Sequence, residues 1–407
     1  MRIAVVSQYF TPEPAKIPVG VAQGLASRGH SVRVVTGYPN YPTGRLYEGF
    51  RRRLVHYERH GSVLVRRVPM VIGHSANPVG RFANYASFAL GSLMTRRFVQ
   101  DADVVYVYAT QMTAALAPQY WRRSIGIPYV LHVQDLWPES VAHSSLIPGF
   151  AQGLVIRGMS RWLELAYRRA SAVIAIAPTM ARRLAERGAD PKHVETVLNW
   201  ADEAFVQPRQ QNLAHRAGLV VVYAGSLGDV QNLETAIDAA RLVADELSEF
   251  RLVIVGGGIA ESRLKKAAAG LNNVEFRGRV SIEEMDGVYA DSDFQLIILR
   301  DLPFLRGTIP SKLQGSLAAG VPVISAVAGD LGALVDAEGV GLTAEPDNPE
   351  SLAEAFRRAY AMPLRSRLEM GERARRTYVE TMSFEKGIDR IEQVLKRAAC
   401  ARVGGPA

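Results

Sequence analysis

The stretch 132-HVQDLWPES-140 places two carboxylates and an indole ring directly after a run of apolar residues. The apolar run at 128–133 predicts a buried strand, and open α/β sheets bind ligands at the carboxyl ends of their strands. Asp135 and Glu139 are separated by a proline, so they need not share a helical face, and we do not interpret them as a paired acid and base. We expect a binding site at this strand end. Alternatively, Asp135 caps a turn and Trp137 fills the domain core.

A lysine stands in the first turn of another predicted element. In the stretch RGTIPSKLQ, Thr308 or Ser311 can cap a helix that runs to about 319. The free N–H groups of that first turn, together with Lys312, suit an anion such as a diphosphate. A lysine at this position opposes the helix dipole, so we interpret it as serving a ligand. The alternative is an ordinary capped helix with a solvated lysine.

Two predicted strands end in loops of small residues. The stretch VYAGSLG contains Gly225 and Ser226, and the stretch VIVGGGIAE contains Gly256 and Gly257. Glycines at such positions let a ligand approach the backbone closely. The second loop does not fit the G-x-G-x-x-G spacing, so it only weakly supports a dinucleotide-dependent dehydrogenase. A tight strand-to-helix turn is the other interpretation.

Two D-x-D strings, at 101–103 and 291–293, raise the question of a metal site. Both stand just before predicted strands, at the amino ends, where polar entry loops explain them better. No His/Cys cluster has the spacing of metal ligands. We therefore expect no metal.

Short β-rich runs alternate with helical segments along the chain, which predicts parallel sheets covered on both faces. A polar break at 199–217 separates two such series. We expect an α/β protein with two Rossmann-like, doubly wound parallel-sheet domains in tandem, and a ligand where the domains face each other. The expected strands are 2–7, 31–36, 63–68, 103–108, 128–133, 172–177, 194–198, 219–224, 251–255, 273–276, 293–299, 321–325 and 340–343. The expected helices are 19–28, 80–99, 111–123, 150–169, 179–187, 231–246, 260–269, 281–290, 311–319, 350–361 and 365–381.

The composition is that of a globular protein, with 407 residues, 48% hydrophobic and 22% charged. A single cysteine, Cys400, allows no disulfide framework and fits a reducing cytosol. The first residues enter a strand-like run without the pattern of a signal peptide. The apolar segment 82–94 is shorter than the roughly 20 residues that a membrane span needs.

Positive charge is concentrated in the first half of the chain. Residues 1–200 carry a net charge of +13 and residues 201–407 a net charge of −5. Arginine clusters at 51–53, 66–67, 96–97 and 122–123, interleaved with Phe50, Phe82, Phe98, Trp121 and Trp162, suit an anionic membrane surface. Surface composition tuned for solubility is the alternative. No nucleic-acid-binding module is recognisable, so we expect no nucleic acid as a partner.

Several strings together resemble the retaining GT-B glycosyltransferases of family 4. They are 7-SQYFTPE-13, the segment 27–42 with its YPNYP, 133-VQDLWPES-140, 308-TIPSK-312 and 318-AAGVP-322. The subgroup is that of the fucosamine, colanic-acid and O-antigen type transferases of bacterial surface polysaccharide synthesis. The resemblance runs from residue 1 to about 380. It implies an acceptor domain at 1–198, a nucleotide-sugar domain at 199–383, and a final helix at about 384–398 that packs back on the first domain.

The resemblance implies transfer of a sugar, without a metal, from a UDP-activated N-acetylated or deoxy sugar to a lipid-linked or polysaccharide-precursor acceptor. The resemblance also implies that the anomeric configuration is retained and that the departing diphosphate accepts the acceptor's proton. No cofactor is needed, and the enzyme would be cytoplasmic and peripheral on the inner face of the plasma membrane. From their places at the strand end and in the first turn of the predicted helix, we expect Asp135, Lys312 and Glu139 to be the catalytic residues. We expect the acceptor to be bound by Glu13, His132, Gln134 and Trp137. The expected donor-binding residues are Gly225, Ser226, Gly256, Gly257, Arg279, Arg306, Thr308, Ser311 and Lys312.

The chain departs from the family's pattern at several positions. Gly307 and Gly315 stand where the broad family has a pair of glutamates, the second of which holds the ribose. Ser226 and Gln231 replace a basic pair, and Gln134 replaces a histidine. The subgroup resembles this chain in most of these changes. They also motivate a second hypothesis, a non-catalytic GT-B subunit that binds nucleotide sugar or glycolipid. A nucleotide-sugar epimerase is a third.

Overall fold

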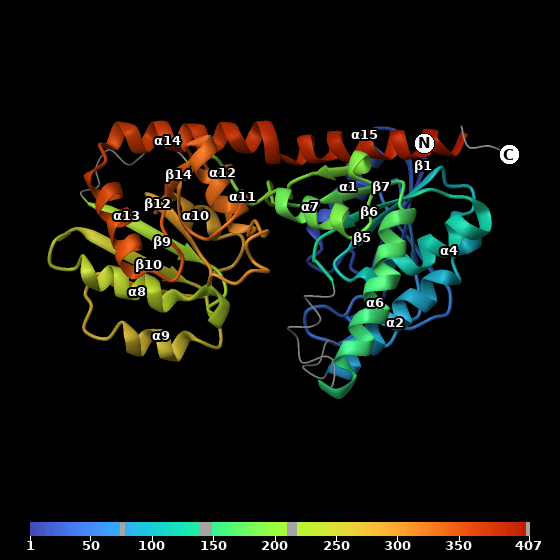
Figure 1. Cartoon of the computed structure of the whole chain (residues 1–407), viewed down its shortest axis with the longest axis horizontal. Coiled ribbons are helices and arrows are strands. Elements are labelled where there is room, and N and C mark those ends of the chain that lie inside the picture. The colour runs from blue at the N-terminus through green and yellow to red at the C-terminus, as the bar shows by residue number, and fades with distance from the viewer. Residues whose placement is uncertain (74–77, 138–148, 210–217, 404–407) are drawn as a thin grey trace. The chain divides into compact units, whose positions relative to one another are not determined.

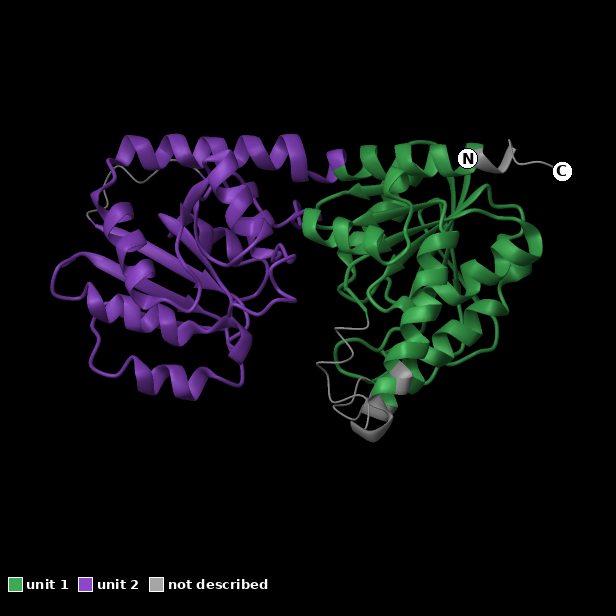
Figure 2. Ribbon diagram, viewed as in Figure 1, with its two compact units in different colours: residues 1–198, 387–407 green, residues 199–386 purple. Residues whose placement is uncertain are grey.

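The computed structural model describes residues 1–73, 78–137, 149–209 and 218–403. The chain divides into two compact units, one formed by Met1–Leu198 with Gly387–Ala407 and the other by Asn199–Lys386 (Figure 2). Each unit is a sheet covered by helices.

The first unit contains an eight-stranded sheet in the order β3-β4-β2-β1-β5-β6-β7-β8. The valine- and isoleucine-rich strands β1, β5 and β6 are almost wholly buried, as expected of parallel strands covered on both faces. Only the edge strand β3 runs antiparallel, against β4. The strands are β1 (Arg2–Ser7), β2 (Ser31–Thr36), β3 (His56–His60), β4 (Val63–Arg67), β5 (Val104–Ala109), β6 (Tyr129–Val133), β7 (Ala172–Ala175) and β8 (Val194–Thr196).

Helices connect these strands: α1 (Lys16–Ser27), α2 (Pro78–Leu93), α3 (Arg96–Val99), α4 (Leu116–Ile125), α6 (Gly149–Arg169) and α7 (Pro178–Glu186). The C-terminal helix α15 (Phe384–Val403) belongs to this unit from Gly387 onward. Arg28, just after α1, pairs with Asp389 and Glu392 at 2.7 and 2.9 Å. His30 also contacts Glu392, at 2.9 Å. These ion pairs fasten the C-terminal helix to the first unit.

The second unit contains a six-stranded parallel sheet in the order β11-β10-β9-β12-β13-β14. Helices α8, α9 and α13 cover one face, and α10, α11 and α12 the other (Figure 1). The strands are β9 (Leu219–Ala224), β10 (Phe250–Val255), β11 (Val274–Gly278), β12 (Phe294–Ile298), β13 (Val323–Ala326) and β14 (Gly341–Thr343). The helices are α8 (Leu233–Leu242), α9 (Glu261–Ala267), α10 (Met285–Ala290), α11 (Lys312–Ala318), α12 (Asp330–Glu338), α13 (Pro349–Ala361) and α14 (Leu364–Thr377).

The prediction of two parallel-sheet α/β domains is confirmed, and the structure adds details that the sequence patterns missed. Strand β3 and helix α12 were not expected. The single helix predicted at 80–99 is two helices, α2 and α3. None of the described helices is long and apolar enough to cross a bilayer.

Candidate functional site

A partly buried lysine without an acidic partner lies at the carboxyl edge of the second sheet. Lys312 is the first residue of α11, and its Nζ donates a hydrogen bond to Tyr223 Oη at 3.1 Å. The same Nζ lies 4.4 Å from the centre of the Tyr223 ring. Among the described residues, no carboxylate pairs with it. Burial lowers the pKa of Lys312 from its ordinary value of 10.5 to about 8. A bound anion would stabilise the charged form of this lysine, so its setting is typical of an anion-binding site.

The two glycine loops meet each other and this lysine. Gly225 N donates to Val255 O at 2.9 Å, which joins the loops after β9 and β10. A Cβ on Gly225 would lie 2.5 Å from Lys312 Cε, and one on Gly256 would lie 1.8 Å from Gly225 O. Both glycines have positive φ angles, +149° and +138°. The predicted loops therefore converge on Lys312, and their close approach to each other and to the lysine leaves no room for a Cβ at either position.

Tyr223 is a site residue that the sequence reasoning missed. Its hydroxyl accepts from Lys312 and donates to Ser226 O at 2.6 Å, so it joins the lysine to the first glycine loop. A tyrosine inside an apolar strand is typical of a core residue. The available signal was its position, two residues before Gly225 at the end of the strand.

The other predicted donor residues are placed less favourably. Arg306 forms a two-point pair with Asp301, at 2.8 Å for both bonds, so its charge is already compensated. Ser311 occupies the N-cap position of α11 without a side-chain capping bond, so the capping predicted for Thr308 or Ser311 is wrong. Arg279 is exposed and lies against Gly257, where a Cβ would be 2.6 Å from Arg279 Nε. Of these residues, Arg279 is best placed to reach a ligand at the second loop.

At the carboxyl edge of the first sheet, Asp135 reaches solvent two residues after β6. Neighbouring atoms nevertheless surround its carboxyl group closely enough that the loss of hydration raises its pKa. Its charge also contributes to the raised pKa values of Tyr85 and Tyr108. Tyr85 lies close to Trp137, with 6.4 Å between the ring centroids. A carboxylate and aromatic rings suit the hydroxyls and apolar faces of a saccharide.

Tyr9 and Tyr85 extend this edge and were not among the predicted site residues. Their hydroxyl groups are joined by a hydrogen bond. Tyr9 also packs against Tyr41, with ring centroids 5.1 Å apart. All three tyrosines are half-buried and come from separate segments. The signal in the sequence was weak, because tyrosines at loop starts are common in cores.

His132 does not contact an acceptor, and its predicted role is wrong. The side chain is fully buried in β6, with Nδ1 2.5 Å from Tyr106 Oη. Burial lowers the pKa of His132 to about 3, so the imidazole is neutral. A strand covered on both faces offers no solvent-facing side for this residue.

Glu13 shapes the site instead of touching its ligand, which corrects its predicted role. Its side chain is only 5% exposed. Its carboxylate accepts backbone N–H groups of Phe10, Asn40 and Tyr41 at 3.2, 2.8 and 2.8 Å. It therefore fixes the loop after β1 against the loop after β2.

Trp137 and Gln134 are largely buried, at 8% and 9% exposure. The carbonyl of Trp137 accepts a hydrogen bond from Arg187 at 2.8 Å. Trp137 therefore mainly packs in the domain interior, in agreement with the alternative interpretation that it fills the core. Glu139 lies outside the described residues.

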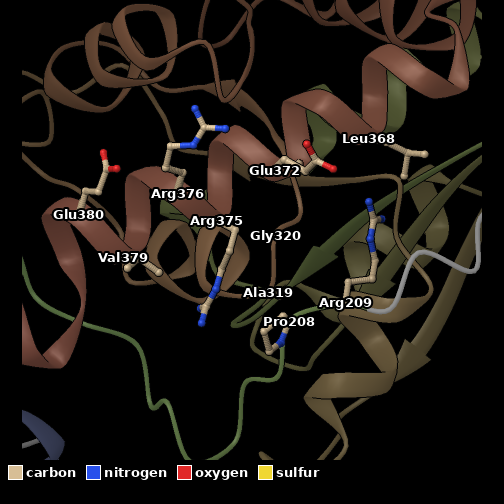
Figure 3. Close-up of a pocket in the computed structure, with 11 residues that line it drawn as sticks. Pro208, Arg209, Ala319, Gly320, Leu368, Glu372, Arg375, Arg376, Val379 and Glu380 are labelled. Carbon is tan, nitrogen blue, oxygen red and sulfur yellow. The ribbon is translucent and has the colours of Figure 1, made fainter.

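One cavity of the second unit is unconnected with this chemistry. About 380 Å³ in volume, it lies beside α14 and the end of α11, with Arg209, Arg375 and Glu372 among its lining residues (Figure 3). Gly320 also lines it, whereas Lys312 stands at the opposite end of α11. Arg375 donates to Ala318 O at 2.7 Å, so its guanidinium stabilises the end of that helix. We therefore assign a structural role to the residues that line this cavity.

Aspartates of both D-x-D strings form ion pairs with arginines. Asp103 pairs with Arg2 at 2.8 Å, and Asp291 pairs with Arg277 at 3.0 Å. Within the described part of the chain, no group of three or more His, Cys, Asp or Glu residues could hold a metal ion.

The geometry therefore consists of a cationic, glycine-lined edge on one parallel sheet and a carboxylate with aromatic rings on another. Residues 16–200 match the model of a glycosyl transferase 4-like domain, and residues 218–362 match glycosyl transferases group 1. The chain belongs to the glycosyltransferases that combine these two domains. The predicted family is confirmed.

Relatives and solved structures agree with this assignment. The glycosyltransferase is 28% identical over 391 residues to WcaI of Escherichia coli, a putative colanic acid biosynthesis glycosyl transferase. The matched region covers 89% of this chain and 93% of WcaI. Sucrose-phosphate synthase from Thermosynechococcus elongatus shares the fold, with a TM-score of 0.73, 16% identity, and 98% and 99% of the two chains covered. Anabaena HepE in complex with UDP has a TM-score of 0.69 at 17% identity, with 97% and 100% covered.

Proposed function

We propose that this glycosyltransferase transfers a UDP-activated N-acetylated or deoxy sugar, with retention, to a lipid-linked or polysaccharide-precursor acceptor. The observation that carries the donor half is the partly buried Lys312, without an acidic partner among the described residues, beside two glycine-containing loops. The UDP complex of HepE supports the same ligand class. The colanic acid assignment in the printed name of WcaI supports the acceptor class.

The chemistry is bond exchange at the anomeric carbon. The bond from that carbon to the diphosphate oxygen breaks, and the acceptor hydroxyl oxygen bonds to the carbon on the same face. The hydroxyl proton passes to the departing diphosphate. Lys312 and the loop backbone N–H groups stabilise the negative charge that develops on the phosphates. No metal takes part in this proposal.

Asp135 is proposed to orient hydroxyl groups of the sugar or acceptor. Its carboxylate is exposed at a strand end, with Tyr85 close by. A carboxylate held among protein atoms forms strong hydrogen bonds to hydroxyl groups. Asp135 is therefore the residue through which the first unit acts on the reacting groups.

The enzyme is proposed to act in the cytoplasm, peripherally on the inner face of the plasma membrane. Phe82, Leu90 and Met94, on or just after α2, are exposed by 65%, 61% and 59%, and suit an apolar contact with lipid. Of the aromatic residues expected at that surface, Phe98 and Trp121 are buried and cannot face lipid. Phe82 is the predicted aromatic residue that this surface keeps. The predicted arginine cluster at Arg66 and Arg67 is buried and cannot face lipid either.

A non-catalytic nucleotide-sugar-binding subunit is the second candidate, and one observation favours it. A Cβ on Gly315 would lie 2.3 Å from Tyr289 Oη, so a glutamate could stand where the broad family has its ribose-binding residue only if the Tyr289 side chain moved. The test is incubation of the protein with radiolabelled UDP-sugars and membrane lipid extracts. Transfer to lipid supports the proposal, binding without turnover supports the subunit, and conversion of the free UDP-sugar supports an epimerase.

A further inference from the structure

An arginine-lined cavity opens in the first unit, between α6 and the C-terminal end of α7. Its volume is about 580 Å³. Four arginines and two glutamates line it, so its lining carries net positive charge. The arginines are Arg157, Arg161, Arg168 and Arg187, and Trp137 contributes to the wall. The reaction proposed above uses none of these arginines.

Three of the arginines form one stripe along α6. At 100° per residue, Arg157, Arg161 and Arg168 lie within about 40° of one another around the helix axis. A rise of 1.5 Å per residue separates the first two by about 6 Å and the last two by about 10 Å. Like charges four residues apart destabilise a helix, so the sequence accepts a cost at Arg157 and Arg161. A bound anion would remove that cost.

The four guanidinium groups are not equally engaged. Arg168 pairs with Glu164 at 2.7 Å, and Arg187 donates to the carbonyl of Trp137 at 2.8 Å. Arg157 and Arg161 are exposed and, in the part of the chain that the structure describes, have no acidic partner. Two guanidiniums are therefore available to a ligand at the cavity.

The cavity adjoins the candidate acceptor edge. Trp137 lines it and also packs near Tyr85, and Asp135 stands only two residues before Trp137. A molecule whose saccharide lies at Asp135 can therefore place a charged group at the arginines. Paired N–H donors of guanidinium match phosphate oxygens in a two-point geometry, which an ammonium group cannot provide.

We propose that this cavity binds the phosphate or diphosphate group of a phosphorylated acceptor, with Arg157 and Arg161 as its principal ligands. The inference rests on the proposed function, since it identifies the acceptor of that reaction as a phosphate ester. The concave shape favours a single bound group over the flat surface of a membrane. Arg168 and Arg187, held by their partners, form its sides.

The test uses the full chain with saturating UDP, so that the donor site is filled, and calorimetric titration with inorganic diphosphate and with geranyl diphosphate. The double variant Arg157→Gln/Arg161→Gln keeps helix propensity and removes both charges. We expect its dissociation constants for both probes to rise tenfold or more. The matched control, Arg51→Gln/Arg52→Gln, removes two exposed arginines elsewhere in the same unit. This control variant should change the dissociation constants for both probes less than twofold.

The two probes also separate the sources of the phosphate. Tighter binding of geranyl diphosphate than of inorganic diphosphate supports a lipid-linked acceptor, and equal binding supports a soluble phosphorylated saccharide. Unchanged diphosphate binding in the double variant would overturn the inference. So would a loss confined to binding of phosphatidylglycerol vesicles, which would make the stripe a membrane contact. Absence of sugar transfer by a protein that still binds diphosphate through these arginines would refute the proposed function alone.

Discussion

Replacing Lys312 by methionine should raise the stability of the second unit and lower turnover at the same time. Methionine keeps most of the side-chain volume while it removes the charge. Tyr223 Oη still donates to Ser226 O in the variant, so the substitution leaves no orphaned hydroxyl. The two effects have opposite signs because the charge opposes folding and serves the ligand.

The magnitude follows from the lowered pKa. The change from 10.5 to about 8 corresponds to about 3 kcal/mol of unfavourable free energy for the charged form. The contact of the ammonium with the Tyr223 ring, 4.4 Å away, returns up to about 2 kcal/mol. We expect a net gain of about 1–3 kcal/mol, or about 2–12 °C in the melting temperature of a unit of this size. Loss of one electrostatic donor should cost about 2–4 kcal/mol in the transition state, roughly 30- to 1000-fold in turnover.

The assay combines calorimetric melting of the ligand-free protein with turnover at saturating acceptor. Lys265→Met is the control, because Lys265 is exposed and pairs with Glu261 at 2.8 Å. The control should change neither turnover nor melting temperature by much. A Lys312→Met protein that melts early and transfers sugar at the normal rate would show that the lysine is structural. Arg279 would then be the leading candidate for holding the diphosphate.

Five further outcomes are expected. Because Lys312 loses its charge as pH rises through about 8, kcat/KM for the donor should fall above that pH, and a profile flat to pH 10 would contradict the assignment. Between pH 8 and 10.5 the unfolded state binds more protons at this lysine, so stability should rise with pH there in the wild type and not in Lys312→Met. Asp135→Asn should lower turnover at least 30-fold (about 2 kcal/mol) with UDP affinity and melting temperature nearly unchanged, whereas early melting would make the residue structural. Activity should survive EDTA, and a loss restored by Mg²⁺ or Mn²⁺ would overturn the metal-free chemistry. The protein should sediment with anionic vesicles at low salt and leave them at high salt, and equal binding to neutral vesicles would contradict the electrostatic account.

The elements that the sequence predicted best are those whose pattern is unambiguous. Continuous apolar runs such as 128–133 became fully buried strands, since only a parallel sheet covered on both faces hides every side chain. Strand β3, with the sequence HYERH, was missed because an edge strand needs no apolar run. Helix α12 was missed because its sequence, DLGALVDAE, is short and contains a glycine, which is typical of a loop.

The donor edge could be predicted in parts but not as an assembly. Each glycine loop and Lys312 was recognisable by its place after a strand or at the start of a helix. Their mutual contact depends on the order of strands in the sheet, where β9 lies between β10 and β12. That order brings residues 225, 256 and 312 together, although 87 positions separate the first from the last. Local periodicity carries no information on such a distance.

The acceptor edge shows why residue type alone misplaces function. Glu13, His132 and Trp137 are the kinds of residue that bind sugars, yet each is at least nine-tenths buried. Side chains inside a strand that is covered on both faces cannot reach solvent. Side chains in the loops after the strands hold those loops in place, as Glu13 does by accepting hydrogen bonds from three backbone N–H groups. Asp135 is neither inside the strand nor bound to a loop backbone. It follows the last hydrogen bond between β6 and β5, which Gln134 N donates to Ala109 O. The first residue beyond that bond is therefore the one through which this sheet can act on a ligand, and its substitution is the most direct test of the acceptor site.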